Sequence, residues 1–312
     1  MKILVTGGAG FIGSHVADAF LAAGHDVTVI DDLSSGRREN VPAGARFVQL
    51  DIRDQAAVDA LFAATRFDAM SHQAAQTSVS VSTREPVRDA QINVLGTIHL
   101  LEAAVRTGVA HVVFASTGGA IYGEVPEPTL ASLETPQRPL SPYACSKLAC
   151  EAYLRRYAHD FALEATVLRY ANVYGPRQDP HGEAGVVAIF TQRLMAGEPI
   201  RVNARKVEGD AGCVRDYVYV GDVVKANLRA LTRQIGLPVV HCATGVETTT
   251  RTLAERIERA LGVKGSIGVA PRRDGDVERS VLEPTREATG TAPTSLDEGL
   301  AATVAWFRER TR

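Results

Sequence analysis

Three glycines placed directly between an apolar run and an amphipathic stretch constrain this chain more than any other feature. Residues 2 to 6 are mostly apolar, Gly7, Gly10 and Gly13 follow at a spacing of three, and a helical pattern continues to about Ala23. Glycine permits a tight turn and lets the backbone approach a pyrophosphate closely, with the first amides of the helix directed at the anion. The segment therefore predicts a strand, a turn and a helix that together hold a dinucleotide.

The rest of the first half repeats this alternation of strand and helix. A second strand over residues 26 to 30 ends at Asp31, and apolar runs recur near residues 46 to 50, 68 to 72 and 110 to 115. Crossovers of a dozen or more residues between such runs indicate parallel strands, with helices covering both faces of the sheet. We expect an α/β fold with a doubly wound parallel sheet.

Two long helices are expected beside this sheet. The first spans residues 84 to 107, with Pro86 in its first turn and Gly108 at its end, and the second spans residues 141 to 161. Beyond Arg169 the pattern loosens into loops rich in Gly and Pro, and the loop at residues 179 to 185 is expected to contact a substrate. Two later helices are predicted to begin at capping boxes, which pair Thr252 with Glu255 and Ser295 with Glu298.

The acidic residue at the end of the second strand indicates which dinucleotide is bound. Asp31 follows Gly13 by 18 residues, close to the spacing of about 20 at which a carboxylate receives the ribose hydroxyls of adenosine. Arg37 and Arg38 would be able to meet a 2′-phosphate, but a carboxylate at the strand end repels that group. NAD is therefore favoured over NADP. Asp51, at the end of the third strand, is expected near the adenine, with a solvated helix cap as the alternative.

Tyr143 and Lys147 form the pair with the clearest chemical meaning. A helix places residues four apart on one face, and Tyr143 is the one tyrosine of eight with Lys at the fourth position onward, in a chain with five lysines and 29 arginines. A free phenol has a pKa of about 10, and a neighbouring cation favours its ionised form. Tyr143 is therefore a candidate general base for an alcohol proton, assisted by Lys147.

Composition excludes several classes of protein. The 312 residues carry a net charge of −2 and a pI near 6.5, so there is no basic field for nucleic acid. No apolar run approaches the roughly 18 residues that span a bilayer, and no signal peptide is expected. The cysteines form no C-x-x-C pair, so we expect a reducing cytoplasm and no disulfide framework, and no histidines pair for a metal. The four cysteines are Cys145, Cys150, Cys213 and Cys242.

Three motifs together resemble the extended short-chain dehydrogenase/reductase family: Thr6-Gly-Gly-Ala-Gly-Phe-Ile-Gly13, Tyr143-x-x-x-Lys147 and Arg215-Asp-Tyr-Val-Tyr-Val-x-Asp222. The resemblance spans essentially the whole chain, and finer matches are similar to the UDP-glucose (UDP-galactose) 4-epimerase branch of that family. These finer matches are Asp31-Asp-Leu-Ser-Ser-Gly36, His72-Gln-Ala-Ala-Gln76, Gly118-Gly-Ala-Ile-Tyr-Gly123 and Asn172-Val-Tyr-Gly-Pro-Arg177.

The resemblance implies two domains and a homodimer. A Rossmann domain over residues 1 to 170 would retain NAD and carry the Tyr/Lys pair, and a smaller C-terminal α/β region over residues 171 to 312 would bind a UDP-sugar, with the chain crossing back to the first domain. The helices at 85 to 107 and 141 to 161 resemble those that pair family dimers into a four-helix bundle. Their apolar residues would equally suit burial against the sheet.

The resemblance also implies contacts to the cofactor along the whole dinucleotide. His72 lies in one of these motifs and is interpreted as structural. The implied cofactor residues are Gly7, Gly10, Phe11, Ile12 and Gly13 at the pyrophosphate, Asp31, Asp32, Leu33, Ser35 and Gly36 at the adenosine ribose, Asp51 and Ile52 at the adenine, Gln73, Ala74, Ala75 and Asn93 along the NAD, and Tyr143 with Lys147 at the nicotinamide ribose.

The implied reaction is a 4-epimerisation. Tyr143 would remove the proton of the sugar 4-hydroxyl while hydride passes to NAD, and the transient 4-keto sugar would turn over before hydride returns to its opposite face. The implied substrate residues are Thr117, Tyr143, Asn172, Arg215, Arg273 and Asp276, with the arginines binding the diphosphate as bidentate donors rather than lying as ordinary surface residues.

Two departures from the branch leave questions open. Gly118 stands where epimerases usually carry a Ser or Thr that relays the proton, so Thr117 is the first substitute and Ser116 the second, although both are equally explained as strand-end residues. Ser280 stands where a bulky Tyr is frequent, which predicts tolerance of N-acetylhexosamine nucleotides.

Three other functions compete with the UDP-glucose epimerase. A nucleotide-sugar 4,6-dehydratase needs Asp and Glu beside the Thr, where this chain has Gly118 and Gly119. An epimerase or decarboxylase for another nucleotide sugar, such as a UDP-N-acetylhexosamine or UDP-glucuronate, shares the same motifs. A non-catalytic NAD sensor on the same fold has no need of Tyr143 and Lys147.

Overall fold

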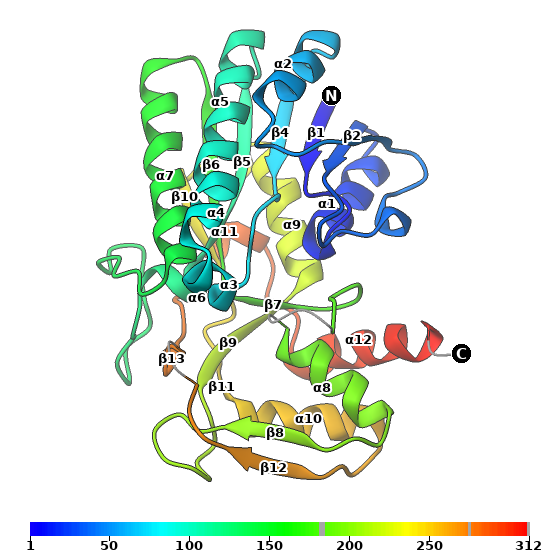
Figure 1. Ribbon diagram of the computed structural model, residues 1–312, viewed down its shortest axis with the longest axis vertical. Coiled ribbons are helices and arrows are strands. Elements are labelled where there is room, and N and C mark those ends of the chain that lie inside the picture. The colour runs from blue at the N-terminus through cyan, green and yellow to red at the C-terminus, as the bar shows by residue number, and fades with distance from the viewer. Residues whose placement is uncertain (181–184, 274–275, 311–312) are drawn as a thin grey trace.

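A single parallel sheet organises the upper part of the molecule in Figure 1. The computed structural model describes residues 1–180, 185–273 and 276–310. Seven strands pair in parallel in the order β10-β6-β5-β4-β1-β2-β3, which confirms the doubly wound Rossmann sheet. The strands are β1 (Lys2–Thr6), β2 (Asp26–Asp31), β3 (Arg46–Gln49), β4 (Ala69–His72), β5 (His111–Thr117), β6 (Glu164–Tyr170) and β10 (Val239–Cys242).

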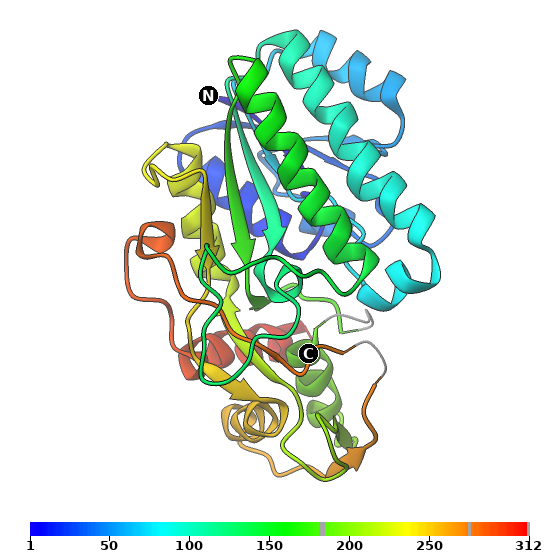
Figure 2. The same ribbon diagram turned by 90° about the vertical axis from the view of Figure 1, so that its left-hand side faces the viewer.

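Helices cover both faces of this sheet, as Figure 2 shows from the side. Successive side chains of a strand point to opposite faces, so Ile3 of β1 joins one core with Val16 and Phe20, while Leu4 joins the other core with Leu100. The helices of the first face are α1 (Phe11–Ala22), α9 (Val220–Leu231) and α11 (Arg286–Thr289), and those of the second are α2 (Gln55–Ala64), α5 (Gly96–Thr107) and α7 (Pro142–Asp160).

The predicted helix over residues 84 to 107 is wrong at its start. Arg84 ends a separate short helix, α3 (Val79–Arg84), and the long helix begins at Pro86. Proline disfavours the helical conformation of the residue before it, and Glu85 accordingly has φ −129° and ψ 58°. The helix then runs through α4 (Pro86–Ala90), a π-helical turn (Gln91–Leu95) and α5, and ends as predicted at Gly108 with φ 79°.

A smaller α/β part forms the lower half of Figure 1. Its core contains Tyr174, Phe190, Leu253, Ile257 and Leu300. The strands are β7 (Asn172–Tyr174), β9 (Val214–Tyr219), β11 (Glu247–Thr249) and β13 (Arg279–Ser280) in one sheet, with β8 (Ile200–Asn203) paired to β12 (Ile267–Ala270). The helices are α8 (Val186–Met195), α10 (Thr250–Leu261) and α12 (Leu296–Arg310), and two short elements of the upper part are η1 (Arg38–Asn40) and α6 (Gly118–Ile121).

One of the two predicted capping boxes is confirmed. Ser295 Oγ accepts a hydrogen bond from the Glu298 amide at 3.3 Å, and the Glu298 carboxylate accepts one from the Ser295 amide at 3.1 Å. The box assigned to Thr252 is wrong, because α10 begins one turn earlier. Thr249 is the cap, and its hydroxyl accepts a hydrogen bond from the Thr252 amide at 3.1 Å.

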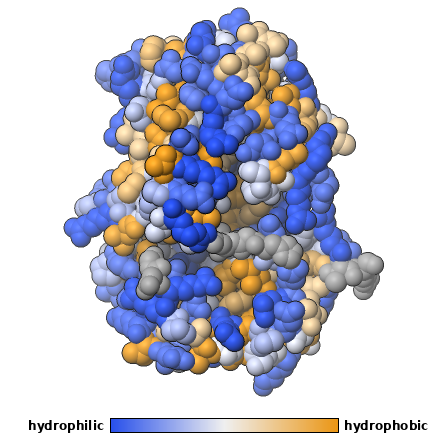
Figure 3. All heavy atoms as spheres, in the orientation of Figure 1, coloured by the Kyte–Doolittle hydropathy of each residue, from blue (hydrophilic) through white to orange (hydrophobic). Residues whose placement is uncertain are grey.

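The strand order places a binding crevice at a defined edge of the central sheet. The order reverses between β1 and β4, and open α/β sheets bind ligands beyond the carboxyl ends of the strands at such a point. Thr6 ends β1, His72 ends β4 and Thr117 ends β5 at that edge. The smaller part lies next to the same edge in Figure 1, and the surface is hollowed where the two parts meet in Figure 3.

Candidate active site

The glycine turn between β1 and α1 leaves room for backbone and anion but for no side chain. Gly7 has φ 66°, and a Cβ at this position would lie 2.6 Å from the Ala74 amide nitrogen. A Cβ at Gly13 would lie 2.1 Å from the Gly7 carbonyl oxygen. Gly10 is the N-cap of α1, and no side chain caps the first turn. The free amides at Phe11 and Ile12 therefore fit a pyrophosphate.

The segment after β4 is fixed against this turn by buried polar contacts. Thr6 Oγ1 accepts hydrogen bonds from the Gln73 and Ala74 amides at 3.2 and 3.1 Å, and the half-buried Ala75 continues the segment. His72 contacts the Thr6 hydroxyl at 2.7 Å. Burial lowers the pKa of His72 to about 3, with the Lys147 charge as the second cause. His72 is therefore neutral at physiological pH, and its contact with Thr6 joins β4 to β1. This agrees with the structural role that the sequence analysis gives to His72.

Asn93 does not present a free amide to the expected cofactor position. Its Oδ1 accepts a hydrogen bond from the Gln76 amide at 2.9 Å, and its Nδ2 donates to the Gln76 carbonyl at 2.9 Å and to Asp89 at 3.0 Å. Gln73 is engaged in the same way, because its Nε2 donates to Asn227 at 3.0 Å. The side chains of both residues fix the segment, and the cofactor contacts expected of them stay predictions.

Asp31 joins the glycine turn to the loop after β2. Its Oδ2 accepts a hydrogen bond from the Ala9 amide at 3.0 Å and its Oδ1 accepts one from the Leu33 amide at 2.9 Å. Burial raises the pKa of this carboxyl. A Cβ at Gly36 would lie 2.7 Å from Asp31 Oδ1, so the loop closes directly over the carboxylate. Asp32 and Ser35 are exposed on the same loop.

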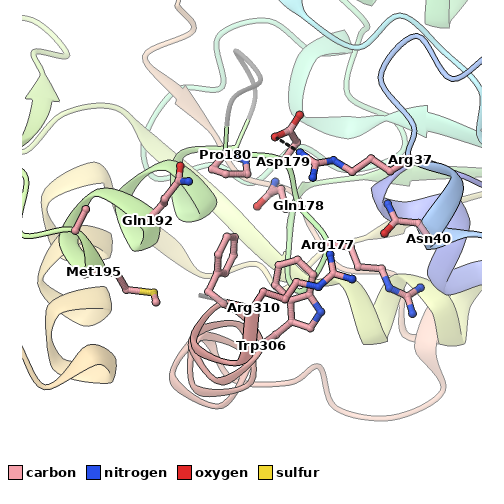
Figure 4. A pocket seen from close by; sticks show the side chains of 12 residues that line it. Arg37, Asn40, Arg177, Gln178, Asp179, Pro180, Gln192, Met195, Trp306 and Arg310 are labelled. Atoms are coloured by element: carbon pink, nitrogen blue, oxygen red, sulfur yellow. Dashed lines mark ion pairs between the residues drawn. The ribbon is translucent and has the colours of Figure 1, made fainter. Parts of the chain in front are cut away.

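The arginines considered for a 2′-phosphate have other partners. Arg37 lies in a crevice of about 360 Å³ beside α12 and forms an ion pair with Asp179 at 3.6 Å (Figure 4). Arg177 lines the same crevice and binds Asp18 at 2.6 Å. Arg38 stacks over the Phe47 ring at 4.5 Å. These contacts support the choice of NAD over NADP.

Asp51 is held by an arginine of its own segment. Its carboxylate accepts a hydrogen bond from Arg53 Nε at 3.0 Å, and this contact is the main cause of the lowered pKa of Asp51. Asp51 Oδ1 also accepts a hydrogen bond from the Arg53 amide at 2.9 Å, as in an Asx turn, while Ile52 beside it is buried. The helix-cap alternative for Asp51 is wrong, because Asp54 is the N-cap of α2 and accepts the hydrogen bond from the Ala57 amide; the adenine contact stays a prediction.

Tyr143 and Lys147 lie on the face of α7 that faces the carboxyl end of β5. Lys147 is 4% exposed, its Nζ donates to the Ala115 carbonyl at 2.8 Å, and it lies 4.8 Å from the centre of the Phe114 ring. Burial lowers the pKa of Lys147 to about 8. Burial also raises the pKa of Tyr143 to about 12, opposed by a hydrogen bond with Thr117. In the protein alone, desolvation therefore outweighs the hydrogen bond with Thr117, and the pKa of the phenol stays above its usual value.

The two candidate relay hydroxyls have different surroundings. Ser116 Oγ donates to Glu151 Oε1 at 2.5 Å, which commits it to a buried network. The Thr117 hydroxyl caps no helix although Thr117 is the N-cap residue of α6, and its hydrogen bond is with Tyr143. Thr117 is therefore the better placed of the two, as the sequence suggested, and Ser116 contacts a structural carboxylate.

The two glycines after Thr117 have no space for larger side chains. A Cβ at Gly118 would lie 2.3 Å from Leu282 Cδ1, and a Cβ at Gly119 would lie 2.9 Å from Asn172 Oδ1. Asn172, predicted to contact the sugar diphosphate, is thus brought directly to the β5–α6 turn. The buried Leu282 occupies the volume that a relay hydroxyl at position 118 would need.

Two of the remaining predicted substrate residues, Arg215 and Asp276, lie near Cys213 on the smaller part. Charges of Arg215, Asp276 and Arg272 all act on the Cys213 thiol, whose pKa is raised chiefly by burial. Arg215 is half-buried and Asp276 is half-buried, whereas Arg273 is exposed. Arg272, which the sequence interpretation passed over, donates to the Asp276 carbonyl at 3.3 Å.

Two further predictions concern this region. Ser280 is buried in β13 opposite Arg215 of β9. Of the loop expected to contact substrate, residues 181 to 184 lie outside the described part of the chain, as do residues 274 and 275 between Arg273 and Asp276.

A buried ionic network beneath Lys147 was missed by the sequence interpretation. Glu151 accepts two hydrogen bonds from Arg169, at 2.6 and 3.0 Å, and their side chains are 1% and 5% exposed. Arg169 also donates to the Tyr122 hydroxyl at 2.5 Å, which contacts His241 at 2.7 Å. Glu151 lies four residues after Lys147, so the helix spacing that identified Tyr143 would also have identified Glu151.

Two negative findings apply to the part of the chain with described coordinates. No group of three or more His, Cys, Asp or Glu residues lies close enough to hold a metal ion there. In the same residues, no helix combines the length and apolar character that crossing a bilayer requires.

Comparisons with known proteins agree with this geometry. Residues 3–240 match the model of the NAD dependent epimerase/dehydratase family. A UDP-glucose 4-epimerase of Mycolicibacterium smegmatis is 46% identical, with 100% of each chain covered. The crystal structure of a Thermus thermophilus UDP-glucose 4-epimerase in complex with NAD is 50% identical, with a TM-score of 0.94 and 99% of each chain covered. A Thermotoga maritima UDP-glucose 4-epimerase solved with UDP-glucose is 44% identical, with a TM-score of 0.93 and 100% of each chain covered.

Proposed function

The chain belongs to the NAD-dependent epimerase/dehydratase family, and from this premise we propose that it is an NAD-dependent UDP-glucose 4-epimerase. The observation that carries the proposal is the placement of Tyr143 and Lys147 on α7 beside the carboxyl end of β5, where Lys147 Nζ donates to the Ala115 carbonyl at 2.8 Å and the glycine turn opens at the same sheet edge. This placement gives an alcohol substrate a proton acceptor beside the position of a dinucleotide, with Thr117 at the end of β5 as the proposed relay.

The proposed roles follow from what each side chain contacts. Tyr143 accepts the proton of the sugar 4-hydroxyl, through Thr117 or directly, and later returns it. Lys147 holds positive charge beneath the phenol and presents an ammonium for a ribose hydroxyl. NAD, held at the glycine turn and by the loop that Asp31 fixes, supplies a reversible hydride acceptor. A transient 4-keto sugar that turns in the site receives hydride on its opposite face, so C4 is inverted with no net redox change.

The geometry disfavours a 4,6-dehydratase. Elimination of water needs an acid and a base beside Thr117, yet side chains at Gly118 and Gly119 would collide with Leu282 and Asn172. Epimerisation needs neither group. A non-catalytic NAD sensor has no need of an ammonium buried at the site, because burial of a charged group costs stability. The site therefore supports an isomerase.

We propose that the UDP moiety binds across the smaller part. Asn172 at the β5–α6 turn and Arg215 on β9 are placed to meet a diphosphate, and Arg273 with Asp276 would close over the uridine side. An arginine matches two phosphate oxygens at once. Because Ser280 in β13 is small, UDP-N-acetylglucosamine is a second substrate to test, and its turnover would extend the specificity without altering the mechanism.

One assay tests the proposed function. Purified protein is incubated with UDP-glucose without added cofactor, UDP-galactose formation is followed by proton NMR, and NAD released on denaturation is measured. We expect interconversion and bound NAD. The matched variant Tyr143→Phe is expected to retain NAD and to lose about 10²- to 10⁴-fold in turnover, the range typical of a positioned acid–base group. Bound NAD without turnover of any UDP-sugar by the wild type would favour the sensor instead.

We further propose a homodimer formed by the outer faces of α5 and α7. These helices lie side by side in Figures 1 and 2, and large apolar side chains are exposed on α7 and on the π-helical turn that precedes α5. Leu95 is 49% exposed and Tyr153 is 41% exposed. Light scattering is expected to give twice the chain mass, and Tyr153→Glu is expected to give a monomer. A wild-type monomer would contradict the proposal.

The state of the cysteines supports a proposed location in the cytoplasm. All four are free thiols, with Cys145 exposed and the other three buried. Free thiols persist where the compartment is reducing. Localisation of the tagged full chain by fractionation checks this proposal.

A further inference from the structure

Asp89 of α4 is a carboxylate buried to 1% exposure directly beside α7. Its Oδ2 accepts a hydrogen bond from Ser146 Oγ at 2.6 Å. Its Oδ1 accepts hydrogen bonds from Gln76 Nε2 at 2.9 Å and from Asn93 Nδ2 at 3.0 Å. All three donors are neutral, and among the described residues Asp89 forms no ion pair. Both oxygens of the Asp89 side chain therefore accept hydrogen bonds from the surrounding segments.

These contacts connect the acid–base helix to the segment that lines the expected cofactor position. Ser146 lies on α7 between Tyr143 and Lys147 in the sequence. Gln76 belongs to the segment that follows β4, and Asn93 holds its backbone amide and carbonyl at 2.9 Å each. Movement of α7 relative to this segment would therefore break the buried hydrogen bonds of one carboxylate, which makes such movement costly.

Asp89 is also the carboxylate near Lys147 whose charge is not already matched. Burial is the main cause of the lowered pKa of Lys147, and Cys150, Asp89 and Glu151 oppose it in that order. Glu151 is neutralised by a bidentate pair with Arg169, whereas Asp89 has neutral donors alone. The ammonium itself has one hydrogen-bond acceptor, the Ala115 carbonyl. An unmatched anion and an unmatched cation thus lie in one buried region.

The other titratable groups that face this region are neutral at physiological pH. Burial lowers the pKa of His72 on β4 and raises the pKa of the Cys150 thiol on α7. Tyr143 is a neutral phenol until it is ionised, and the Asp89 charge is a further cause of its raised pKa. On α4 itself, Arg88 is exposed and pairs with Glu85 at 2.9 Å.

We propose that Asp89 is a positioning residue for the Tyr143–Lys147 pair, which locks α7 against the 73–78 segment and supplies the buried negative charge that balances the Lys147 ammonium. The proposal rests on the proposed acid–base role of that pair. Burial alone moves Lys147 towards its neutral form, and a neutral amine would no longer favour the phenolate. The negative charge of Asp89 favours the ammonium form of Lys147 and so opposes this effect of burial.

The test compares two ways of removing the contact. Asp89→Asn removes the charge and keeps a side chain of the same shape, whereas Ser146→Ala removes one hydrogen bond and keeps the charge. Glu85→Gln removes a charge from the exposed surface at the start of the same helix and is the matched control. Each full-length protein is labelled with ¹³C-lysine, and the five lysine signals are titrated by NMR, with Lys147→Arg identifying the Lys147 signal. The pH profile of epimerisation is measured in parallel.

Removal of a nearby negative charge lowers the pKa of an ammonium and of a phenol alike. In Asp89→Asn we expect the Lys147 titration and both limbs of the rate profile to move to lower pH by about one unit. Ser146→Ala is expected to lower the rate with unmoved limbs, and Glu85→Gln to change neither. An unchanged Lys147 titration in Asp89→Asn would overturn the proposal, even where the rate falls. If Asp89→Asn does not fold, Asp89→Ser, which admits water to Gln76 and Asn93, serves in its place. Because the NMR titration needs no turnover, its result is separable from failure of the proposed function.

Discussion

Replacing Thr117 by Val separates a proton relay from a simple strand-end residue. Val has the shape of Thr without the hydroxyl, and both are β-branched, so the backbone at the end of β5 is expected to remain in place. Thr117 is 9% exposed, and its hydroxyl makes its hydrogen bond with Tyr143 rather than with the first turn of α6. The substitution therefore removes one contact to the phenol and little else.

The size of the effect follows from the charge that develops on the phenol. A hydrogen bond to a charged group contributes about 1.5–3 kcal/mol. At about 1.4 kcal/mol for each factor of ten, Thr117→Val is expected to lower kcat by roughly 10- to 150-fold. The Thr117 bond lowers the pKa of Tyr143. Its loss raises that pKa, so the acid limb of the rate profile is expected to move to higher pH.

Ser116→Ala is the matched control for this experiment. Ser116 precedes Thr117 on the same strand, but its hydroxyl donates to Glu151. The control is expected to cost about 1.5–3 kcal/mol of unfolding free energy through the loss of one buried hydrogen bond to a charged group and to leave the acid limb in place, because Glu151 Oε1 still accepts from Arg169. The assay is the initial rate of UDP-glucose epimerisation from pH 5.5 to 10. A Thr117→Val enzyme within threefold of the wild-type rate, with an unmoved acid limb, would refute the relay.

Three further predictions concern stability and cofactor retention. Burial depresses the pKa of His72 to about 3, so the unfolded chain binds more protons than the folded protein below about pH 6.5. The free energy of unfolding should therefore fall as pH decreases, by up to about 1.4 kcal/mol per pH unit for this group. Urea unfolding of His72→Gln should show a smaller difference between pH 7 and pH 5 than that of the wild type. Arg169→Met leaves the buried Glu151 unpaired and should cost about 3–5 kcal/mol of unfolding free energy; a loss below about 1 kcal/mol by urea titration would contradict the buried pair. Gly13→Ala places a methyl group against the Gly7 carbonyl and should lower both the melting temperature and the NAD released on denaturation, whereas full NAD content would argue against the tight turn.

The sequence predicts the sheet well because its signals are local. β1, the glycine turn and α1 depend on neighbouring residues, and the predicted helix end at Gly108 is set by one left-handed residue with φ 79°. The start of the same helix is less well predicted, because a proline is compatible with several positions in the first turn of a helix, so Pro86 does not fix the first residue. The capping box at Thr252 failed for a similar reason, since Thr249 offers the same side chain three residues earlier.

The polar interior of the site is less predictable because its partners are distant in the sequence. Asp89 and Ser146 are 57 residues apart in the sequence, and Glu151 on α7 pairs with Arg169 on β6. Nothing in the local pattern distinguishes Asp89 from a residue of a solvated helix face, and the helix spacing that points to Glu151 does not indicate its partner Arg169 on β6. The motif predicts Asn93 at the cofactor, and the structure adds that its amide binds Gln76 and Asp89. A motif identifies which residues matter, and packing decides whether a side chain meets a ligand or the protein.

The depth of burial explains why the acid–base pair needs the rest of the site. Desolvation moves Tyr143 and Lys147 in opposite directions, the phenol to a pKa of about 12 and the ammonium to about 8, so both are pushed towards their neutral forms. At neutral pH the protein alone therefore holds an un-ionised phenol beside an ammonium. Any positive charge placed next to Tyr143 lowers its pKa, and the oxidised nicotinamide carries such a charge. Proton acceptance by Tyr143 is thereby linked to the presence of the oxidised cofactor, and an enzyme emptied of NAD should show no ionisation of Tyr143 in its ultraviolet difference spectrum below about pH 10. A tyrosinate signal near pH 8 in that form would show that the surroundings of the phenol are less desolvating than its burial implies.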